Sequence, residues 1–230
     1  MVLVGANGAG KTTLLRSIAG LLHPKTGTVE VFGKPLRSYR RKELAARVAY
    51  VPQVDGRSAP FTVEQFVLLG RYPHLRPLSG PTASDLKAVQ RALELTGTVH
   101  LRDRRLEALS GGEAQKVFIA ACLAQEAPCL LLDEPTTFLD YRHQVEILRL
   151  LSDLNRSEGV TVIAATHDLG CALQVSQRAL ALHSGRIVFD GPAEELAREE
   201  LLQEIYETAF CVVRHPVTRK PVPLPGGGGL

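Results

Sequence analysis

Short apolar runs alternate with helix-like stretches along most of the chain. Val2–Val4, Cys129–Leu132 and the largely apolar Val160–Thr166 have the length and continuity of strands buried on both faces of a parallel sheet. Thr13–Ile18 and Asp140–Glu158 lie between such runs and carry apolar residues at helical spacing. This alternation predicts an α/β fold in which helices wrap a mostly parallel sheet.

The pattern changes in three places. Thr28–Phe32 is predicted as a strand that follows a turn. From about residue 58 to 127 prolines become frequent and the periodicity is helical, with Asp85–Leu95 predicted as a helix capped by Ser84. Residues 212–230 are rich in proline and end in a glycine run, which predicts an irregular, partly disordered tail after a main domain at 1–211.

The composition is that of a soluble globular protein, with 45% apolar and 22% charged residues among 230. No apolar stretch approaches the ~18 residues that a membrane helix needs, and Met1 opens directly into a predicted strand, so we expect no signal peptide. A net charge of +3 without a basic-aromatic stripe argues against a nucleic-acid partner. The cysteines show no C-x-x-C spacing, which favours reduced thiols over zinc or disulfides.

Gly5–Thr12 fits the pattern G-x-x-x-x-G-K-S/T between a predicted strand and a predicted helix. In such a P-loop, backbone N–H groups surround phosphates, the lysine (Lys11) reaches the β- and γ-phosphates, and the hydroxyl of Thr12 can coordinate Mg²⁺. The helix N-terminus adds further N–H groups and the positive end of a dipole. A glycine-rich turn without nucleotide is the alternative interpretation.

Asp133 and Glu134 stand at the carboxyl end of a predicted buried strand, where open α/β sheets bind their ligands. Asp133 suits Mg²⁺ coordination through water, and Glu134 suits polarisation of an attacking water. As an ordinary pair of surface charges, the same dipeptide would carry no function.

Leu109–Glu113 has two interpretations. Ser110 can cap a helix while Glu113 returns the bond, which is an ordinary capping box. Gly111 and Gly112, however, lower helix propensity in the first turn. A function that needs close backbone approach explains these glycines better.

In their order along the chain these motifs resemble those of ABC-type ATPases. Leu109–Glu113 resembles the LSGGQ signature, with glutamate in place of glutamine, and Leu130–Glu134 resembles Walker B. Gln53 looks like the Q-loop glutamine, Asp140 lies in a segment similar to the D-loop, and His167 looks like the switch histidine. The resemblance covers nearly the whole chain and implies a P-loop NTPase core with a helical subdomain inserted at about residues 58–127.

The resemblance also implies roles for individual residues. The catalytic positions are Lys11, Gln53, Glu134 and His167. The Mg²⁺ positions are Thr12, Gln53 and Asp133. The ATP-binding positions are Asn7, Gly8, Ala9, Gly10, Lys11, Thr12, Thr13, Ser110, Gly111, Gly112 and Asp140.

The start of the chain departs from the family pattern. ABC ATPases normally carry a few dozen residues before the P-loop, which supply an antiparallel layer and an aromatic residue that stacks on adenine. Here the P-loop strand begins at Val2, so we expect that the start is truncated or misassigned, or that the product lacks this layer, and we name no adenine-stacking residue. The strand predicted at Thr28–Phe32 would then lack partners and expose an edge.

Gly70–His74 and Glu134–Asp140 resemble the corresponding segments of importers for iron-siderophores, haem and cobalamin, and the proline-rich ending is similar to theirs. We therefore expect the ATP-hydrolysing motor subunit of such an importer at the cytoplasmic face of the cell membrane. The resemblance implies a homodimer in which Ser110 and Gly112 of one copy cover ATP bound by the other. It also implies integral membrane permease partners and, indirectly, an extracytoplasmic substrate-binding protein.

Two other function classes compete with this interpretation. A soluble non-transport ABC ATPase would usually have two ATPase cores on one chain and a charged linker, whereas this sequence has one core. A catalytically dead regulatory nucleotide binder would be expected to lose Glu134 or His167, and both are present.

Overall fold

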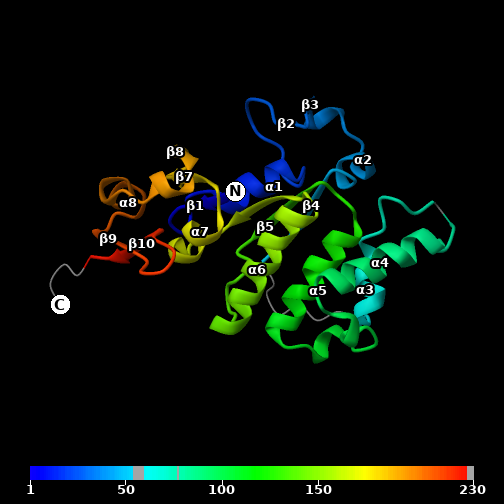
Figure 1. The fold of residues 1–230 in the computed structure, drawn as a ribbon. Helices are drawn as coiled ribbons and strands as arrows, with labels where there is room; N and C mark the ends of the chain where they lie inside the picture. Colours follow the sequence, from blue (N-terminus) through cyan, green and yellow to red (C-terminus); the bar gives the residue numbers. More distant parts are fainter. Residues whose placement is uncertain (54–59, 77, 227–230) are drawn as a thin grey trace. The chain divides into compact units, whose positions relative to one another are not determined.

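The computed structural model describes residues 1–53, 60–76 and 78–226 (Figure 1). Two compact units divide the chain: one combines Met1–Leu15 with Ile163–Leu230, and the other spans Arg16–Val162. Helix α1 (Lys11–Ile18) and strand β6 (Thr161–Ala165) cross from one unit to the other. Each unit has its own parallel strands and its own apolar cluster.

The first unit is built on strands that flank the start of the chain. β1 (Val2–Val4) is parallel to β6 on one side and to β7 (Arg178–His183) on the other, and β7 pairs antiparallel with β8 (Arg186–Pro192). All of β1 is buried, as its apolar run predicts. α7 (Leu169–Val175), the 3₁₀ turn Ala193–Leu196 and α8 (Glu199–Tyr206) add side chains to the same apolar cluster as β1 and β7.

The predicted irregular tail is wrong at residues 212–214 and at Pro221–Pro225, which lie in strands. β9 (Phe210–Arg214) and β10 (Pro221–Pro225) form an antiparallel hairpin. The prolines of β10 alternate with Val222 and Leu224, so only these two residues need to donate an N–H to β9, and the prolines stand where no donor is required. Residues 227–230 of the glycine run lie outside the described residues.

In the second unit, β4 (Val48–Val51) and β5 (Cys129–Asp133) form a parallel pair, with Val51 opposite Leu132. The strand predicted at Thr28–Phe32 is too long, because only β2 (Glu30–Val31) is extended. Phe32 and Gly33 both have positive φ, +49° and +72°, and form the tight turn that leads into its partner β3 (Lys34–Pro35). The 3₁₀ turn Leu36–Ser38 and helix α2 (Arg41–Ala45) follow.

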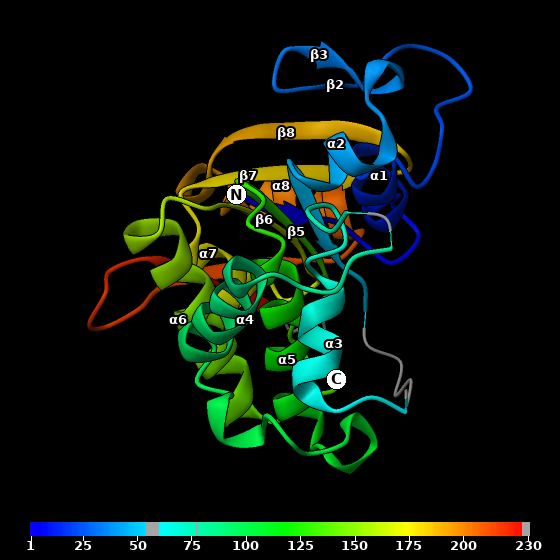
Figure 2. The same cartoon turned by 90° about the vertical axis from the view of Figure 1, so that its right-hand side faces the viewer.

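Three helices of the predicted helical region share one apolar cluster and lie side by side in Figure 2. They are α3 (Val63–Leu69), α4 (Ala83–Leu95) and α5 (Gly111–Ala124). Two 3₁₀ turns, Val99–Leu101 and Leu106–Ala108, connect α4 to α5. The limits proposed for this region as a subdomain stay a prediction.

The cap predicted for α4 is wrong by two residues. Thr82, not Ser84, is the N-cap: its hydroxyl accepts the N–H of Asp85 at 3.3 Å, and Asp85 accepts the Thr82 N–H at 2.8 Å. Arg71, itself buried, binds Asp85 from α3's end at 2.9 Å and thereby fixes the third helical position. Arg71, fourteen residues upstream, is thus a further partner of the carboxylate that completes the cap.

The long helix α6 (Tyr141–Ser157) agrees with the amphipathic pattern, since Ile147, Leu151 and Leu154 are buried along one face. In the same unit, burial raises the pKa of the Cys122 thiol to about 12, which keeps this thiol protonated.

Candidate functional site

The predicted phosphate loop follows β1 in the first unit. Gly8 and Gly10 have φ values of +81° and +104°, a backbone region that L-residues rarely adopt. Gly5 is needed for a second reason, because a Cβ there would overlap the carbonyl oxygen of Leu182. Backbone conformation and packing therefore both require glycine in a loop whose N–H groups can surround an anion.

Lys11 is held inside this loop by the loop itself. Its side chain is buried, and Nζ donates to the carbonyl oxygens of Gly5 at 2.8 Å and Ala6 at 3.2 Å. A buried ammonium group needs such partners. Thr12 and Thr13 follow in the first turn of α1, so the predicted phosphate and Mg²⁺ ligands of this unit are contiguous.

His167 leaves the sheet beside this loop. Ala165 of β6 stands opposite Leu3 of β1, and the N–H of Thr166 donates to the Leu3 carbonyl at 3.0 Å. Since β1 and β6 are parallel, the P-loop and His167 emerge at the same strand ends. The structure therefore brings the predicted switch histidine and the phosphate loop to one edge.

Asp133 ends β5 in the second unit and is 3% exposed. Its Oδ2 accepts a hydrogen bond from the Tyr50 hydroxyl at 3.1 Å. A hydrogen bond with Tyr50 is the main cause of the raised pKa of Arg16, and burial raises the pKa of Tyr50. Arg16, Tyr50 and Asp133 thus form a chain of hydrogen bonds that orients a buried carboxylate.

Glu134, the predicted general base, has φ of +52°. A left-handed conformation at a non-glycine residue costs about 1–3 kcal/mol and is frequent at functional sites. The Thr137 hydroxyl donates to Glu134 Oε2 at 3.0 Å, and the Thr137 N–H donates to the Glu134 carbonyl at 3.2 Å. This short turn holds the carboxylate just beyond the strand end.

Gln53 follows β4 by two residues. Because Val51 stands opposite Leu132 in a parallel pair, Gln53 and Asp133 emerge at the same edge of the second unit. The amide and carboxylate oxygens of these residues suit a hard cation such as Mg²⁺. These two predicted ligands thus follow neighbouring strand ends of the second unit, whereas Thr12 belongs to the first unit, and their role as Mg²⁺ ligands stays a prediction.

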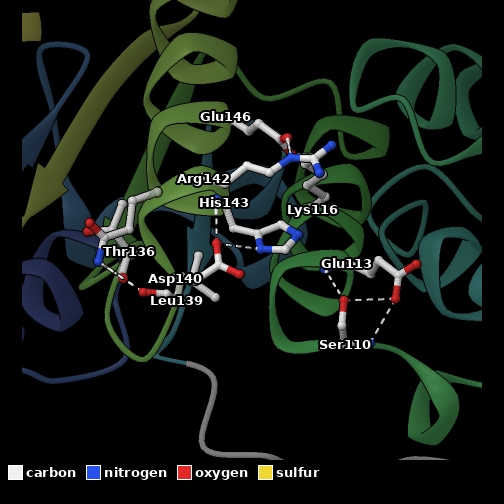
Figure 3. A network of polar contacts seen from close by, with 10 residues as sticks. Ser110, Glu113, Lys116, Thr136, Leu139, Asp140, Arg142, His143 and Glu146 are labelled. Carbon is white, nitrogen blue, oxygen red and sulfur yellow. Dashed lines mark hydrogen bonds and ion pairs between the residues drawn. The ribbon is translucent and has the colours of Figure 1, made fainter.

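The signature segment forms the capping box that its local pattern predicts (Figure 3). Glu113 Oε2 accepts both the N–H and the hydroxyl of Ser110 at 2.8 Å, and Ser110 Oγ accepts the Glu113 N–H at 3.3 Å. The Ser110 N–H is the main cause of the lowered pKa of Glu113. Glutamate in place of the family's glutamine therefore gives the cap a charged acceptor.

Asp140 caps α6 as Ser110 caps α5. Its Oδ1 accepts the backbone N–H of His143 at 2.9 Å and the ring Nδ1 of the same residue at 2.8 Å. Figure 3 shows that this places His143 between the Asp140 loop and the start of α5. The segments predicted as D-loop and signature are therefore neighbours in one unit.

Sequence reasoning missed Tyr50, Thr137 and His143. Each is a common residue type within a strand or motif that was assigned to another residue. Each contacts a predicted site residue: Asp133, Glu134 and Asp140 respectively. For Tyr50 the register of β4 on β5 is the signal that would have found it, since that register sets Tyr50 opposite Leu131, two residues before Asp133.

A glycine-rich loop closing on a buried lysine after a parallel strand is the mark of a P-loop nucleotide hydrolase. The family model for ABC transporters matches residues 1–137. The chain thus belongs to the ABC transporter family, and it is an ATP-hydrolysing member with an ABC cassette fold.

Curated relatives match almost the whole chain. The ferric enterobactin transport ATP-binding protein FepC of Escherichia coli (strain K12) is 40% identical over 225 residues, which are 98% of this chain and 83% of FepC. The hemin import ATP-binding protein HmuV of Nocardia farcinica (strain IFM 10152) is 41% identical over 98% of this chain and 77% of its own length.

Solved structures agree with this placement. An inward-facing ABC transporter assigned to the metal-chelate type matches with a TM-score of 0.86 at 28% identity, over 99% of this chain and 86% of that one. The dimeric cassette MJ0796 in a post-hydrolysis state, bound to ADP and Pi, matches with a TM-score of 0.70 at 26% identity, over 84% of each chain. Within the described residues, no helix is long and apolar enough to cross a bilayer.

Proposed function

We propose that the chain is the ATP-hydrolysing motor of an ABC importer for an iron-siderophore, haem or cobalamin. The observation that carries this proposal is the identity of about 40%, over nearly the full chain, with transport proteins named for ferric enterobactin and hemin. The similarity to an ABC transporter of the metal-chelate type supports the same substrate class.

In the proposed site the chain positions ATP and a water molecule. The P-loop amides and Lys11 hold the phosphates, with Asn7, Gly8, Ala9 and Gly10 in the loop and Thr12 and Thr13 in the first helical turn. Mg²⁺, when bound, offsets the charge that develops on the phosphates, and Thr12, Gln53 and Asp133 are the residues that would hold it. Glu134 orients the attacking water, and His167 contacts the γ-phosphate.

Two copies of the chain complete two sites in this proposal. Ser110, Gly111 and Gly112 of one copy, with its Asp140 segment, cover ATP held by the partner copy. The dimeric state of the similar cassette MJ0796 supports this arrangement. The further partners are permease subunits at the cytoplasmic face of the membrane and, through them, an extracytoplasmic substrate-binding protein.

Co-expression with candidate permease subunits from the same organism tests the proposal. The tagged chain should purify with the permease in detergent, and cells holding the complex should accumulate radiolabelled ferric siderophore, haem or cobalamin. A Lys11→Ala complex should assemble but take up none. Full ATPase activity without any permease association would favour a soluble ABC ATPase instead.

A further inference from the structure

His143 occupies the junction between α6 and the start of α5 (Figure 3). Asp140 Oδ1 bonds to both its backbone N–H and its ring Nδ1, so the ring has little freedom to turn. The His143 side chain is 29% exposed, so most of the ring is covered by neighbouring residues. This geometry fixes where the ring meets α5.

The ring fills the space that a side chain at Gly112 would need. A Cβ built on Gly112 would lie 2.9 Å from His143 Nε2 and would overlap Cγ and Cδ2 of the ring. The neighbouring Gly111 differs, since a Cβ there would meet only Leu139 Cδ2, at an ordinary 3.6 Å. Within a single chain, therefore, His143 already requires glycine at position 112.

Three polar contacts extend the same junction. Lys116, one turn after Gly112, pairs with Glu146 at 2.6 Å, and Glu146 also binds Arg142 at 3.0 Å. Gln144 Nε2, beside His143, donates to the Leu139 carbonyl at 3.0 Å. The first two turns of α6 thus contact the Asp140 loop through Gln144 and α5 through Glu146.

We propose that His143 is a positioning residue that fixes the signature helix α5 against the Asp140 loop. The proposal rests on the proposed function, in which both segments face the partner copy's nucleotide. With the ring in place they form one rigid surface. Gly112 then serves two purposes, approach to the partner's ATP and accommodation of His143.

A stability cycle tests the contact without nucleotide. Gly112→Ala should lower the melting temperature of the full chain by roughly 3–10 °C, since a methyl group is forced into a filled space. Adding His143→Ala should recover part of that loss, because the smaller side chain leaves room for the methyl group. Additive effects of the two changes would overturn the contact, since residues that touch do not act independently.

Kinetics test the positioning role. His143→Ala should lower kcat roughly 10-fold, because a misplaced signature segment lowers the rate of hydrolysis. The Kd of the isolated chain for ATP should stay unchanged, because the P-loop is not altered. His143→Asn keeps a donor for Asp140 and should fall between the wild type and His143→Ala. Arg149→Ala, at an exposed position of α6 outside this junction, is the control and should retain wild-type kcat.

The inference can fail separately from the proposed function. If Ser110→Arg leaves turnover intact, the signature does not serve catalysis and the proposed function is wrong. If Ser110→Arg abolishes turnover while His143→Ala retains wild-type kcat, only the role of His143 is overturned. A loss in His143→Ala that merely follows its melting temperature, with His143→Asn and Arg149→Ala equally impaired, also overturns it.

Discussion

The orientation of Asp133 depends on a residue from the neighbouring strand, because the Tyr50 hydroxyl donates to its carboxylate. Tyr50→Phe should therefore raise the Mg²⁺ concentration needed for half-maximal ATP hydrolysis roughly 10-fold. This is the usual effect of losing a residue that orients a metal ligand. Titration of ATPase activity with Mg²⁺ measures this. Tyr39→Phe is a matched control, since that hydroxyl donates to the Val31 carbonyl at 2.7 Å. If both variants need the same Mg²⁺ concentration for half-maximal activity, Tyr50 does not orient a Mg²⁺ ligand.

Glu134 has a strained backbone, and its carboxylate accepts a hydrogen bond from the Thr137 hydroxyl. Both features are consistent with a carboxylate positioned as a general base. Glu134→Gln should keep ATP binding but lose turnover by a factor on the order of 10² or more, the scale of a positioned general base. ATP should then trap a dimer on size-exclusion chromatography. Glu207→Gln, which also changes a left-handed glutamate but at the end of α8, should hydrolyse ATP normally. Near wild-type turnover in Glu134→Gln would exclude the role.

At the scale of elements, the stability of the fold should depend on pH through the Asp85 carboxylate in the N-terminal cap of α4. Hydrogen bonds from the Thr82 side chain and backbone, and then from Arg71, lower the pKa of Asp85 to about 2. An aspartate side chain in the unfolded protein has a pKa of about 3.9. Ionised Asp85 therefore stabilises the fold above about pH 4, and that stabilisation is lost as the pH falls toward about 2. Asp85→Asn should lower the melting temperature at pH 7, and the gap to wild type should narrow below about pH 4.

The position of the cap itself is testable by the same melting curves. Thr82→Ala should cost about 1 kcal/mol, the usual loss of an N-cap. Ser84→Ala should cost almost nothing, because Ser84 is exposed and lies inside the helix. The opposite ranking would restore Ser84 as the cap.

These elements also show what sequence pattern can and cannot predict. β1, β5 and α6 were predictable, because each buries a continuous or helical set of apolar residues. The β9/β10 hairpin was missed because proline was counted against a strand, although alternation removes the cost. The Thr82–Asp85 capping box is a local sequence pattern that was overlooked in favour of Ser84. The contact of His143 with Gly112, in contrast, joins residues far apart in the chain, and local patterns do not contain such a contact.

At the scale of the whole molecule, motifs on one chain are proposed to build sites with a second copy. The P-loop with His167 and the signature with Asp140 belong to different compact units, and each unit holds a complete local structure of its own. A homodimer that closes over ATP would bring the signature of one copy to the P-loop of the other. Catalysis then depends on positioning and charge, as in phosphoryl transfer generally.

The most direct test of this arrangement compares two mixed dimers that carry the same two changes. In one, Lys11→Ala and Ser110→Arg lie on different copies; in the other, both lie on one copy and the partner is wild type. ATP retained per dimer is measured in a Glu134→Gln background. Sites shared between copies predict retained ATP when the changes are on different copies and none when they are on one. The reverse result would contradict the composite site, because it would show that each P-loop works with the signature of its own chain.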